Sequence, residues 1–201
     1  KKIVALALLT LAGVFTGCAS GHIKVNSANK LAPKAKIERP LIVINVKNKV
    51  FQGSLYRGFH QGLNTYFAAC QSQATLVEFN GDDLALIADQ IRRTAVEKRN
   101  DYVIFFKQEG GRVDQGNGGS FANLNYKVMA YPIAQFEQKD PVEYWYGGFE
   151  QHFLTDNPFV DGFKTGDLLA LQFVQRLESD RVLQPCHFAQ KKVDPKINLL
   201  G

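Results

Sequence analysis

Short apolar runs alternate with two segments of helical periodicity between residues 41 and 106, and this alternation limits the possible folds more than any other feature. The runs cover residues 41–46, 75–79 and 102–106, and their β-branched and aromatic residues are typical of strands covered on both faces. Strands connected through helices make right-handed crossovers. We therefore predict three parallel strands in the spatial order second, first, third, with the two helices on opposite faces of the sheet.

Each connecting segment has one apolar stripe at intervals of three and four residues, which predicts a helix. The first helix is expected from about residue 54 to residue 71, with Ser54 as its N-cap. The second follows the turn signal Asn80-Gly81-Asp82. The stripes are Leu55, Phe59, Leu63, Tyr66, Phe67 and Cys70 in the first helix, and Leu84, Ile87, Ala88, Ile91 and Ala95 in the second.

The pattern changes after residue 106. Residues 108–120 contain five glycines and are expected to form a surface loop without regular structure. Alternating apolar residues from Leu124 to Ala130 predict a strand with one exposed face, and residues 142–153 predict its antiparallel partner. The chain is thus expected to be α/β (α+β): a single mixed sheet of about five strands, three parallel plus an antiparallel hairpin, flanked by about three helices.

The first eighteen residues have the layout of a secretory signal peptide, with two lysines, a thirteen-residue mostly apolar run from Ile3 to Phe15, and the ending Thr16-Gly17-Cys18. The run is shorter than the about 20 apolar residues that cross a bilayer. The small-small-Cys ending resembles a bacterial lipobox. In that family the cysteine sulfur receives a diacylglycerol, the chain is cut before the cysteine, and the new amino terminus is acylated. The resemblance therefore implies that acyl chains on Cys18 insert into a lipid bilayer.

Two other interpretations stay open: a plain signal peptide in which Cys18 is structural, and a short buried helix. Ala19 and Ser20 stand where lipoproteins retained in the inner membrane carry Asp, so the resemblance implies the inner leaflet of the outer membrane, facing the periplasm. The expected organisation is a lipoprotein signal peptide at 1–17, the lipidated cysteine and a flexible basic tether at 18–40, a periplasmic domain at 41–187 and a tail at 188–201.

Cys70 and Cys186 remain once Cys18 is assigned to lipid, and an even pair in an oxidising compartment predicts a disulfide. The alternative is two buried free thiols. A last helix is predicted to begin at Thr165, its N-cap, after a loop at 157–164, and to end before Pro185. If this helix shares a face with the first one, its far end meets Cys70, so the disulfide also tests the topology.

The sequence predicts no catalytic residue, cofactor or metal site. None of the four histidines belongs to a recognised metal-ligand pattern, and the glycine-rich segment lacks the Lys-Ser/Thr of a phosphate-binding loop. A formal charge of +5 gives little reason to expect nucleic acid as a partner. Glu78, Asp101 and Glu109 stand near the ends of predicted strands, where open α/β sheets often place sites, and they keep a hydrolase open as an alternative.

The aromatic arm at residues 144–149 is the best candidate for partner binding. On a strand, Tyr144 and Tyr146 point one way while Trp145 and Phe149 point the other, so one aromatic face covers the core. The second face is covered by the last helix or lies open to a partner or a sugar ring. If it is open, Tyr144, Trp145 or Tyr146 would anchor the partner, with Arg112 of the glycine-rich segment closing over it.

A lipobox, a tether and a β-α-β-α-β unit with a hairpin and a closing helix together resemble a periplasmic α/β domain. This domain occurs in the amino-terminal part of the translocation protein TolB, in curli-type secretion lipoproteins and in lipoprotein activators of penicillin-binding proteins. Residues Asp140-Pro141-Val142-Glu143-Tyr144-Trp145-Tyr146-Gly147 are similar to their common Val-x-Trp-x-Gly strand. The resemblance implies a membrane-anchored, non-enzymatic protein-binding or assembly module with an envelope protein as partner. The alternative is a periplasmic cell-wall or carbohydrate-binding protein or hydrolase.

Overall fold

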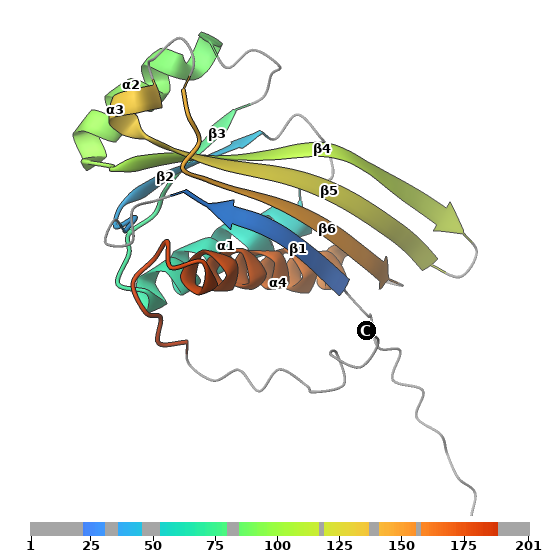
Figure 1. The fold of residues 1–201 in the computed structure, drawn as a ribbon. Coiled ribbons are helices and arrows are strands. Elements are labelled where there is room, and N and C mark those ends of the chain that lie inside the picture. The colour runs from blue at the N-terminus through green and yellow to red at the C-terminus, as the bar shows by residue number, and fades with distance from the viewer. Residues whose placement is uncertain are drawn as a thin grey trace, which may run out of the picture.

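The chain folds around one mixed sheet of six strands with helices on both faces, as the computed structural model shows (Figure 1). The strands follow one another in the order β1-β6-β5-β4-β2-β3, which confirms the predicted fold class with one strand more than expected. The described residues are 22–30, 36–45, 53–79, 85–116, 119–136, 141–155 and 158–188. Their strands are β1 (His22–Asn29), β2 (Pro40–Asn45), β3 (Thr75–Phe79), β4 (Tyr102–Gly116), β5 (Gly119–Pro132) and β6 (Trp145–Thr155). Their helices are α1 (Ser54–Ala69), α2 (Ala85–Lys98), α3 (Ile133–Phe136) and α4 (Pro158–Ser179).

The parallel half of the sheet has the predicted order. β2 lies between β3 and β4 and is parallel to both, with Val43 opposite Val77 on one side and Phe105 on the other. Alternate residues of β2 point to opposite faces, so Ile44 packs in the core with α1 and α4 while Val43 packs in the core with α2. The two crossover helices therefore cover opposite faces, as predicted.

The prediction of a glycine-rich loop at residues 108–120 is wrong for the part that the structure describes. β4 continues to Gly116, and it pairs with β5 over its whole length with an irregularity between Gln108 and Gly110. Glycine has a weak strand propensity, but the backbone of β4 pairs with β5, and β5 in turn pairs with β6. Pairing with a neighbouring strand thus overrides composition here. The predicted antiparallel hairpin of β5 and β6 is confirmed.

The flexible tether predicted for residues 18–40 is corrected by β1. This strand pairs antiparallel with β6, and Ile23 and Val25 pack against the core beneath the sheet. Ile37 is also buried, and its backbone N–H donates to the carbonyl of Val182 at 2.9 Å. The folded domain therefore begins near residue 22 instead of residue 41; residues 18–21 and 31–35 lie outside the described part.

The last helix begins at Pro158, so the predicted loop at residues 157–164 is wrong from that residue onward. Glycines in both helices permit close packing of α4 on α1. A Cβ atom at Gly166 would lie 1.9 Å from the carbonyl oxygen of Leu55, and one at Gly58 of α1 would lie 1.9 Å from that of Phe163. A proline is well tolerated at the first helical position, because no intrahelical bond needs its missing N–H.

α1 is confirmed over Ser54–Ala69, but Gly53 is its N-cap, not Ser54 as predicted. α2 is confirmed over Ala85–Lys98, and the predicted turn at residues 80–82 lies outside the described part. The short helix α3 follows β5 and was not predicted. Among the described residues, no helix is long and apolar enough to span a membrane.

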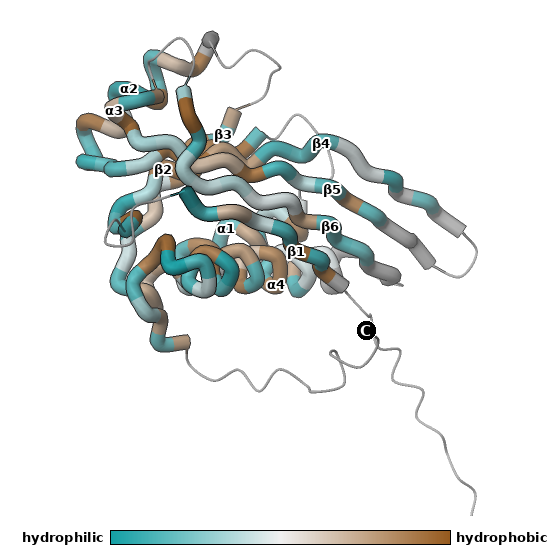
Figure 2. Tube along the Cα trace, in the orientation of Figure 1, coloured by the Kyte–Doolittle hydropathy of each residue, from teal (hydrophilic) through white to brown (hydrophobic). Residues whose placement is uncertain are grey.

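Aromatic residues fill the core that α1 and α4 cover. The ring centroids of Phe106 and Phe173 lie 5.5 Å apart, and those of Phe59 and Phe106 lie 4.7 Å apart. On the opposite face, α2 and α3 pack over the parallel half of the sheet and the adjoining end of β5 (Figure 1). Hydrophilic residues recur along the stretches of β4, β5 and β6 that lie away from these two helices (Figure 2). No described helix covers that part of the sheet.

Candidate functional site on the open face of the sheet

Half of one sheet face is left uncovered by the described helices. Met129 and Phe105 lie opposite each other beneath α2 and α3, and Tyr146 lies opposite Met129, so alternate residues along the outer strands point to this same side. We call this surface the open face. Its members are Lys24 and Asn26 of β1, Lys107, Arg112 and Asp114 of β4, Asn125 and Lys127 of β5, and Tyr146, Gly148, Glu150 and His152 of β6.

The aromatic arm alternates between the two faces as predicted. Trp145 and Phe149 are fully buried beneath α4, whereas Tyr146 is 42% exposed on the open face. Gly147 makes room for the indole, because a Cβ atom there would lie 2.6 Å from the Cη2 atom of Trp145. The structure therefore corrects the prediction for Trp145, which is a core residue and offers no surface to a partner.

The two tyrosines of the arm lie on the opposite side from Trp145. Tyr144 is half-buried, and its hydroxyl accepts a hydrogen bond from Nε2 of Gln135 in α3 at 3.0 Å. The Nζ atom of Lys30 lies 5.9 Å from the ring centroid of Tyr146 and 3.2 Å from Oε1 of Glu143. Of the predicted anchors, Tyr146 is thus the one most available to a partner.

Arg112 shares the open face with Tyr146 but lies at its other end. Arg112 is opposite Asn123 of β5 and Tyr146 is opposite Met129, so six residues of β5 separate them, or about 20 Å at about 3.3 Å per residue. The Arg112 side chain is 79% exposed, and its Nε lies 2.7 Å from Oδ2 of Asp114. The two predicted residues therefore cannot hold the same small group.

Two lysines stand directly opposite each other near the middle of the open face. Lys107 of β4 pairs in register with Lys127 of β5, an arrangement that like charges make unfavourable. Neither lysine forms a salt bridge with any described residue. The pKa of Glu143 is lowered by its own backbone N–H, then by Lys30 and less by Lys127, and its ion pair is with Lys30. The lysine pair thus presents positive charge without a described counter-ion.

A small cavity lies where the open face meets the part of the sheet that α2 covers. It has a volume of about 80 Å³ and is lined by Val43, Asn45, Phe79, Phe105, Phe106, Lys107 and Met129. Val43, Asn45 and Phe79 stand toward the carboxyl ends of β2 and β3, the β4 residues of the lining lie in the first half of that strand, and β5 contributes Met129. The chain runs from β2 through α1 to β3 on one side of β2, and from β3 through α2 to β4 on the other side, and open α/β sheets commonly bind ligands at such a switch point.

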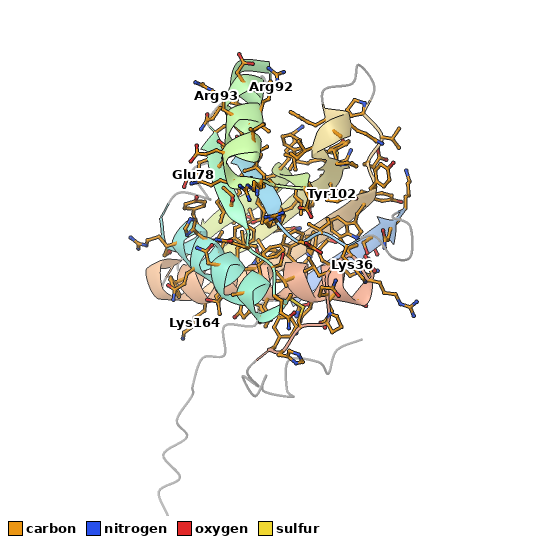
Figure 3. All side chains as sticks on the ribbon, turned by 90° about the vertical axis from the view of Figure 1, so that its left-hand side faces the viewer. Lys36, Glu78, Arg92, Arg93, Tyr102 and Lys164 are labelled. Carbon is orange, nitrogen blue, oxygen red and sulfur yellow. A yellow bond between two sulfur atoms is a disulfide. The ribbon has the colours of Figure 1, made fainter. Side chains whose placement is uncertain are left out.

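Glu78, Asp101 and Glu109, the carboxylates on which the hydrolase alternative depends, do not converge on this cavity. Asp101 stands at the amino end of β4, where its Oδ2 accepts from the backbone N–H of Glu38 at 2.7 Å. Glu78 accepts a hydrogen bond from Tyr56, and burial followed by this contact raises the pKa of the Tyr56 hydroxyl. Glu78 lies on β3 beside the helices, as the side view shows (Figure 3). Glu109 is exposed at the irregularity in β4.

The histidines of the described part are equally scattered. Nε2 of His152 lies 3.1 Å from Oε1 of Glu150 on the open face, and the His60 ring lies 6.0 Å from that of Tyr56 on α1. The backbone N–H of His187 donates to the carbonyl of Ala69. Among the described residues, no three histidine, cysteine or acidic side chains cluster as metal ligands would.

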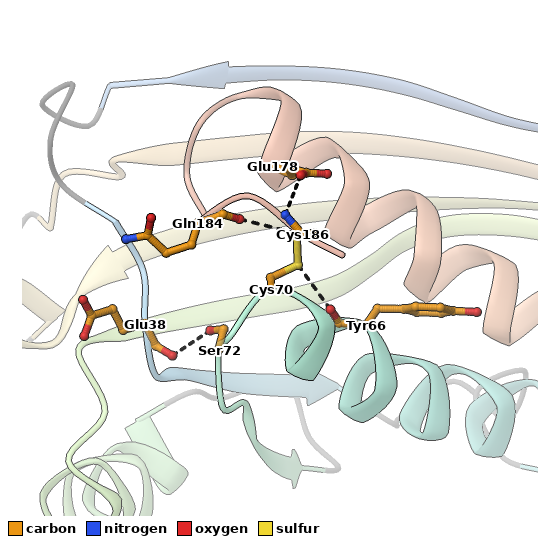
Figure 4. The surroundings of a disulfide bond; sticks show 7 residues. All are labelled: Glu38, Tyr66, Cys70, Ser72, Glu178, Gln184 and Cys186. Carbon is orange, nitrogen blue, oxygen red and sulfur yellow. Dashed lines mark hydrogen bonds between the residues drawn. A yellow bond between two sulfur atoms is a disulfide. The ribbon is translucent and has the colours of Figure 1, made fainter. Parts of the chain in front are cut away.

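The predicted disulfide between Cys70 and Cys186 is present (Figure 4). It joins the C-terminal end of α1 to the segment that follows α4, so these helices share one face of the sheet as the prediction required. The backbone N–H of Cys186 also donates to Oε1 of Glu178 at 2.7 Å. The disulfide thus fixes the helical layer, on the side of the sheet away from the open face.

Comparison with known proteins gives structural likeness only. No protein-family model matches the chain, and no curated protein matches its sequence. A dodecameric variant of PelC from Paraburkholderia phytofirmans is 12% identical with a TM-score of 0.49, over 77% of this chain and 99% of that one. Lipoprotein GNA1162 from Neisseria meningitidis is 10% identical with a TM-score of 0.40, over 71% and 99%. A minor lipoprotein from Acinetobacter baumannii is 12% identical with a TM-score of 0.33, over 74% and 97%.

Proposed function

We propose that this protein is a lipid-anchored component of the bacterial cell envelope that binds another envelope protein through its open face, without catalysing a reaction. The observation that carries the proposal is the open face itself. It is a broad sheet surface with an exposed tyrosine and a pair of lysines that has no described counter-ion, and no described helix covers it. Tyrosine is enriched at protein interfaces and among the residues that dominate their binding energy, and Tyr146 is exposed on this surface.

Two features support the envelope location. The Cys18 ending resembles a lipobox, and the Cys70–Cys186 disulfide suits the oxidising space outside the cytoplasm. In addition, β1 begins four residues after Cys18, and four extended residues reach at most about 14 Å. An acylated Cys18 would therefore hold the domain close to the bilayer instead of at the end of a long tether.

The anchor is tested by mass spectrometry and fractionation of the native protein. We expect three acyl chains on the residue-18 terminus, recovery in the outer-membrane fraction, and release of a Cys18→Ser variant from that fraction. The matched control is Ala19→Asp, which keeps the acylated cysteine but introduces the residue that marks inner-membrane retention in lipoproteins. An unacylated Cys18 in the native protein would disprove the anchored function.

Protein binding is tested by photocrosslinking in intact cells. A photoreactive residue at Tyr146 should give a discrete product containing one envelope protein, identified by mass spectrometry. The same residue at Asn64, exposed on the outer side of α1, should not give that product. Crosslinking of Tyr146 to peptidoglycan fragments instead would favour the cell-wall or carbohydrate-binding alternative. Equal capture from both positions would rule out a specific role for the open face.

A further inference from the structure

The switch-point cavity and the lysine pair of the open face adjoin each other, because Lys107 belongs to both. We propose that together they bind an acidic segment of the partner protein, with one aliphatic side chain in the cavity and carboxylates on Lys107 and Lys127. This inference rests on the proposed protein-binding function and identifies the chemistry of the bound segment. It also assigns the contact to the part of the open face next to α2.

The volume of the cavity decides what can enter it. At about 80 Å³ it is roughly half of the ~150 Å³ cavity that accommodates a benzene ring, and far below the ~300 Å³ or more of small-molecule sites. An aliphatic side chain fits, whereas a cofactor or a sugar ring does not. Val43, Phe79 and Phe105 form apolar walls, so an aliphatic group that enters the cavity is stabilised by the removal of apolar surface from water.

The positive charge beside the cavity determines which residues of the partner segment should lie next to its aliphatic side chain. Lys107 and Lys127 face each other across β4 and β5 and are exposed. Neither has a salt-bridge partner among the described residues, so no described ion pair offsets the repulsion between them. Two carboxylates lying over the pair would remove this repulsion. An acidic segment therefore complements the surface in charge as well as in shape.

The register of the sheet sets the spacing within the segment. Lys107, Lys127 and Gly148 lie in one row across β4, β5 and β6. Neighbouring strands are about 4.8 Å apart, so this row is about 10 Å long, which about three residues of an extended segment cover at about 3.3 Å each. Gly148 leaves the row open, since a Cβ atom there would meet nothing within 4 Å. We expect an aliphatic residue followed by two acidic residues within the next three positions.

The experiment is a selection of binders from random twelve-residue segments displayed internally, so that no free terminal carboxylate is present. The bait is the full mature, acylated protein in phosphatidylcholine nanodiscs. We expect enrichment of an aliphatic residue followed closely by two acids. The best peptide, measured by fluorescence anisotropy, should lose about tenfold or more in affinity on Lys107→Glu/Lys127→Glu and should bind more weakly as salt rises.

Two further variants separate charge from packing. Met129→Trp places a large ring at the cavity and should weaken binding about tenfold without changing the charge. The control Lys98→Glu/Lys164→Glu reverses two exposed lysines outside the open face, on α2 and α4, and should leave the affinity unchanged. Circular dichroism melting of each variant identifies any that fail to fold.

The inference is overturned if no segment is enriched, if the enriched segments lack acids, or if folded charge-reversal and Met129→Trp variants bind as well as the parent. The proposed function has a separate test. If the crosslink from Tyr146 to an envelope protein persists in the Lys107→Glu/Lys127→Glu variant, the proposed protein-binding function is supported. The acidic segment is then rejected as the means of binding. Loss of that crosslink in the charge-reversal variant, but not in the Lys98/Lys164 control, supports both.

Discussion

The indole Nε1 of Trp145 donates a hydrogen bond to Oδ2 of Asp180 at 2.8 Å, and this contact joins the start of β6 to the residue that follows α4. The same carboxylate accepts a hydrogen bond from Ser27 of β1 and lies 3.3 Å from Nε of Arg176. Asp180 thus connects the two outer strands to the helix beneath them. The open face depends on this connection, because it keeps β1 and β6 in place on the sheet.

Replacing Asp180 with alanine should lower the free energy of unfolding by about 2–3 kcal/mol. The buried N–H of Trp145 would lose its acceptor, which costs about 1–3 kcal/mol, and the hydrogen bond from Ser27 would be lost as well. The measurement is urea denaturation followed by tryptophan fluorescence. The control Asp89→Ala breaks an exposed ion pair with Arg92 and should change stability by less than about 0.5 kcal/mol. Equal effects of the two substitutions would contradict a structural role for Asp180.

Substituting Gly166 with alanine should destabilise the protein by about 3 kcal/mol or more, or prevent folding. In an ordinary helix the same change is stabilising by roughly 0.5–1 kcal/mol, so the sign itself is diagnostic. The reason is that the new Cβ would lie 1.9 Å from the carbonyl oxygen of Leu55, which forces α4 away from α1. Thermal melting of Gly166→Ala and of Gly148→Ala makes the comparison. Gly148 is exposed with open space around its Cβ position, so its variant should melt within a few degrees of the parent.

Removing the disulfide should cost about 2–5 kcal/mol of stability. Cys70 and Cys186 are 116 residues apart, and the chain-entropy model gives about 4.7 kcal/mol for a loop of about 100 residues, with smaller values often measured. The Cys70→Ser/Cys186→Ser variant should therefore unfold at lower urea concentration. The parent protein in excess dithiothreitol should shift by a similar amount, while the variant should not respond to dithiothreitol. A variant as stable as the parent would show that α1 and α4 hold together without the bond.

Stability should decline above about pH 10, and Tyr126 should be one cause. Burial raises the pKa of its hydroxyl far above the ordinary tyrosine value, so the folded protein keeps the proton that the unfolded chain releases. The stabilising contribution of neutral Tyr126 is complete below the unfolded pKa and is lost as the pH rises above it. Urea denaturation at pH 8, 10 and 11 should show a shallower decline for Tyr126→Phe. The phenylalanine variant also loses the hydrogen bond to Gln151 at 3.2 Å, so the comparison concerns the slope with pH and not the absolute stability.

Local patterns were sufficient to predict the parallel half of the sheet, because continuous β-branched runs such as the one around Val43 and helical stripes such as Leu55 to Cys70 are visible within short windows. The errors concern interactions between distant segments. β1 has only Ile23 and Val25 as apolar residues on its inner side, and its pairing with β6 depends on a strand more than a hundred residues away. The last helix was predicted to begin at Thr165, yet α4 begins at Pro158, and a Cβ atom at its Gly162 would lie 2.5 Å from Oγ of Ser54 in α1.

In the candidate site, too, local patterns were predicted correctly and contacts between distant segments were not. Alternation along residues 144–149 correctly separated Tyr146 from Trp145, but it could not say which face α4 covers, since that depends on packing. The lysine pair could not be predicted from the sequence, because Lys107 and Lys127 become neighbours only through the register of β4 and β5. The cavity likewise needs side chains from four strands to be brought together. Sites of this kind become predictable once strand order and register are known.

The short link between Cys18 and β1 leads to a last prediction about orientation. His22 at the start of β1 lies opposite His152, which lies opposite Asn123, and Asn123 lies opposite Arg112. The row that contains Arg112 is therefore at the end of the sheet where β1 begins, while the row of Tyr146 is about 20 Å farther along it. An acylated Cys18 should hold the Arg112 end at the bilayer and direct the cavity end toward the periplasm.

A fluorescent amino acid at Arg112, in acylated protein reconstituted into liposomes, should be quenched by lipids that carry a quencher on the headgroup. The same fluorophore at Gln135 of α3, which follows the opposite end of β5, should be quenched much less. Inserting twenty Gly-Ser residues after Ser20 lets the domain move away and tumble, because a flexible linker of that length has a mean span of about 25 Å. The difference between the two positions should then disappear. Equal quenching at both positions without the insertion would show that β1 does not hold the domain in one orientation, and the partner would then have to be sought on more than the periplasmic end of the open face.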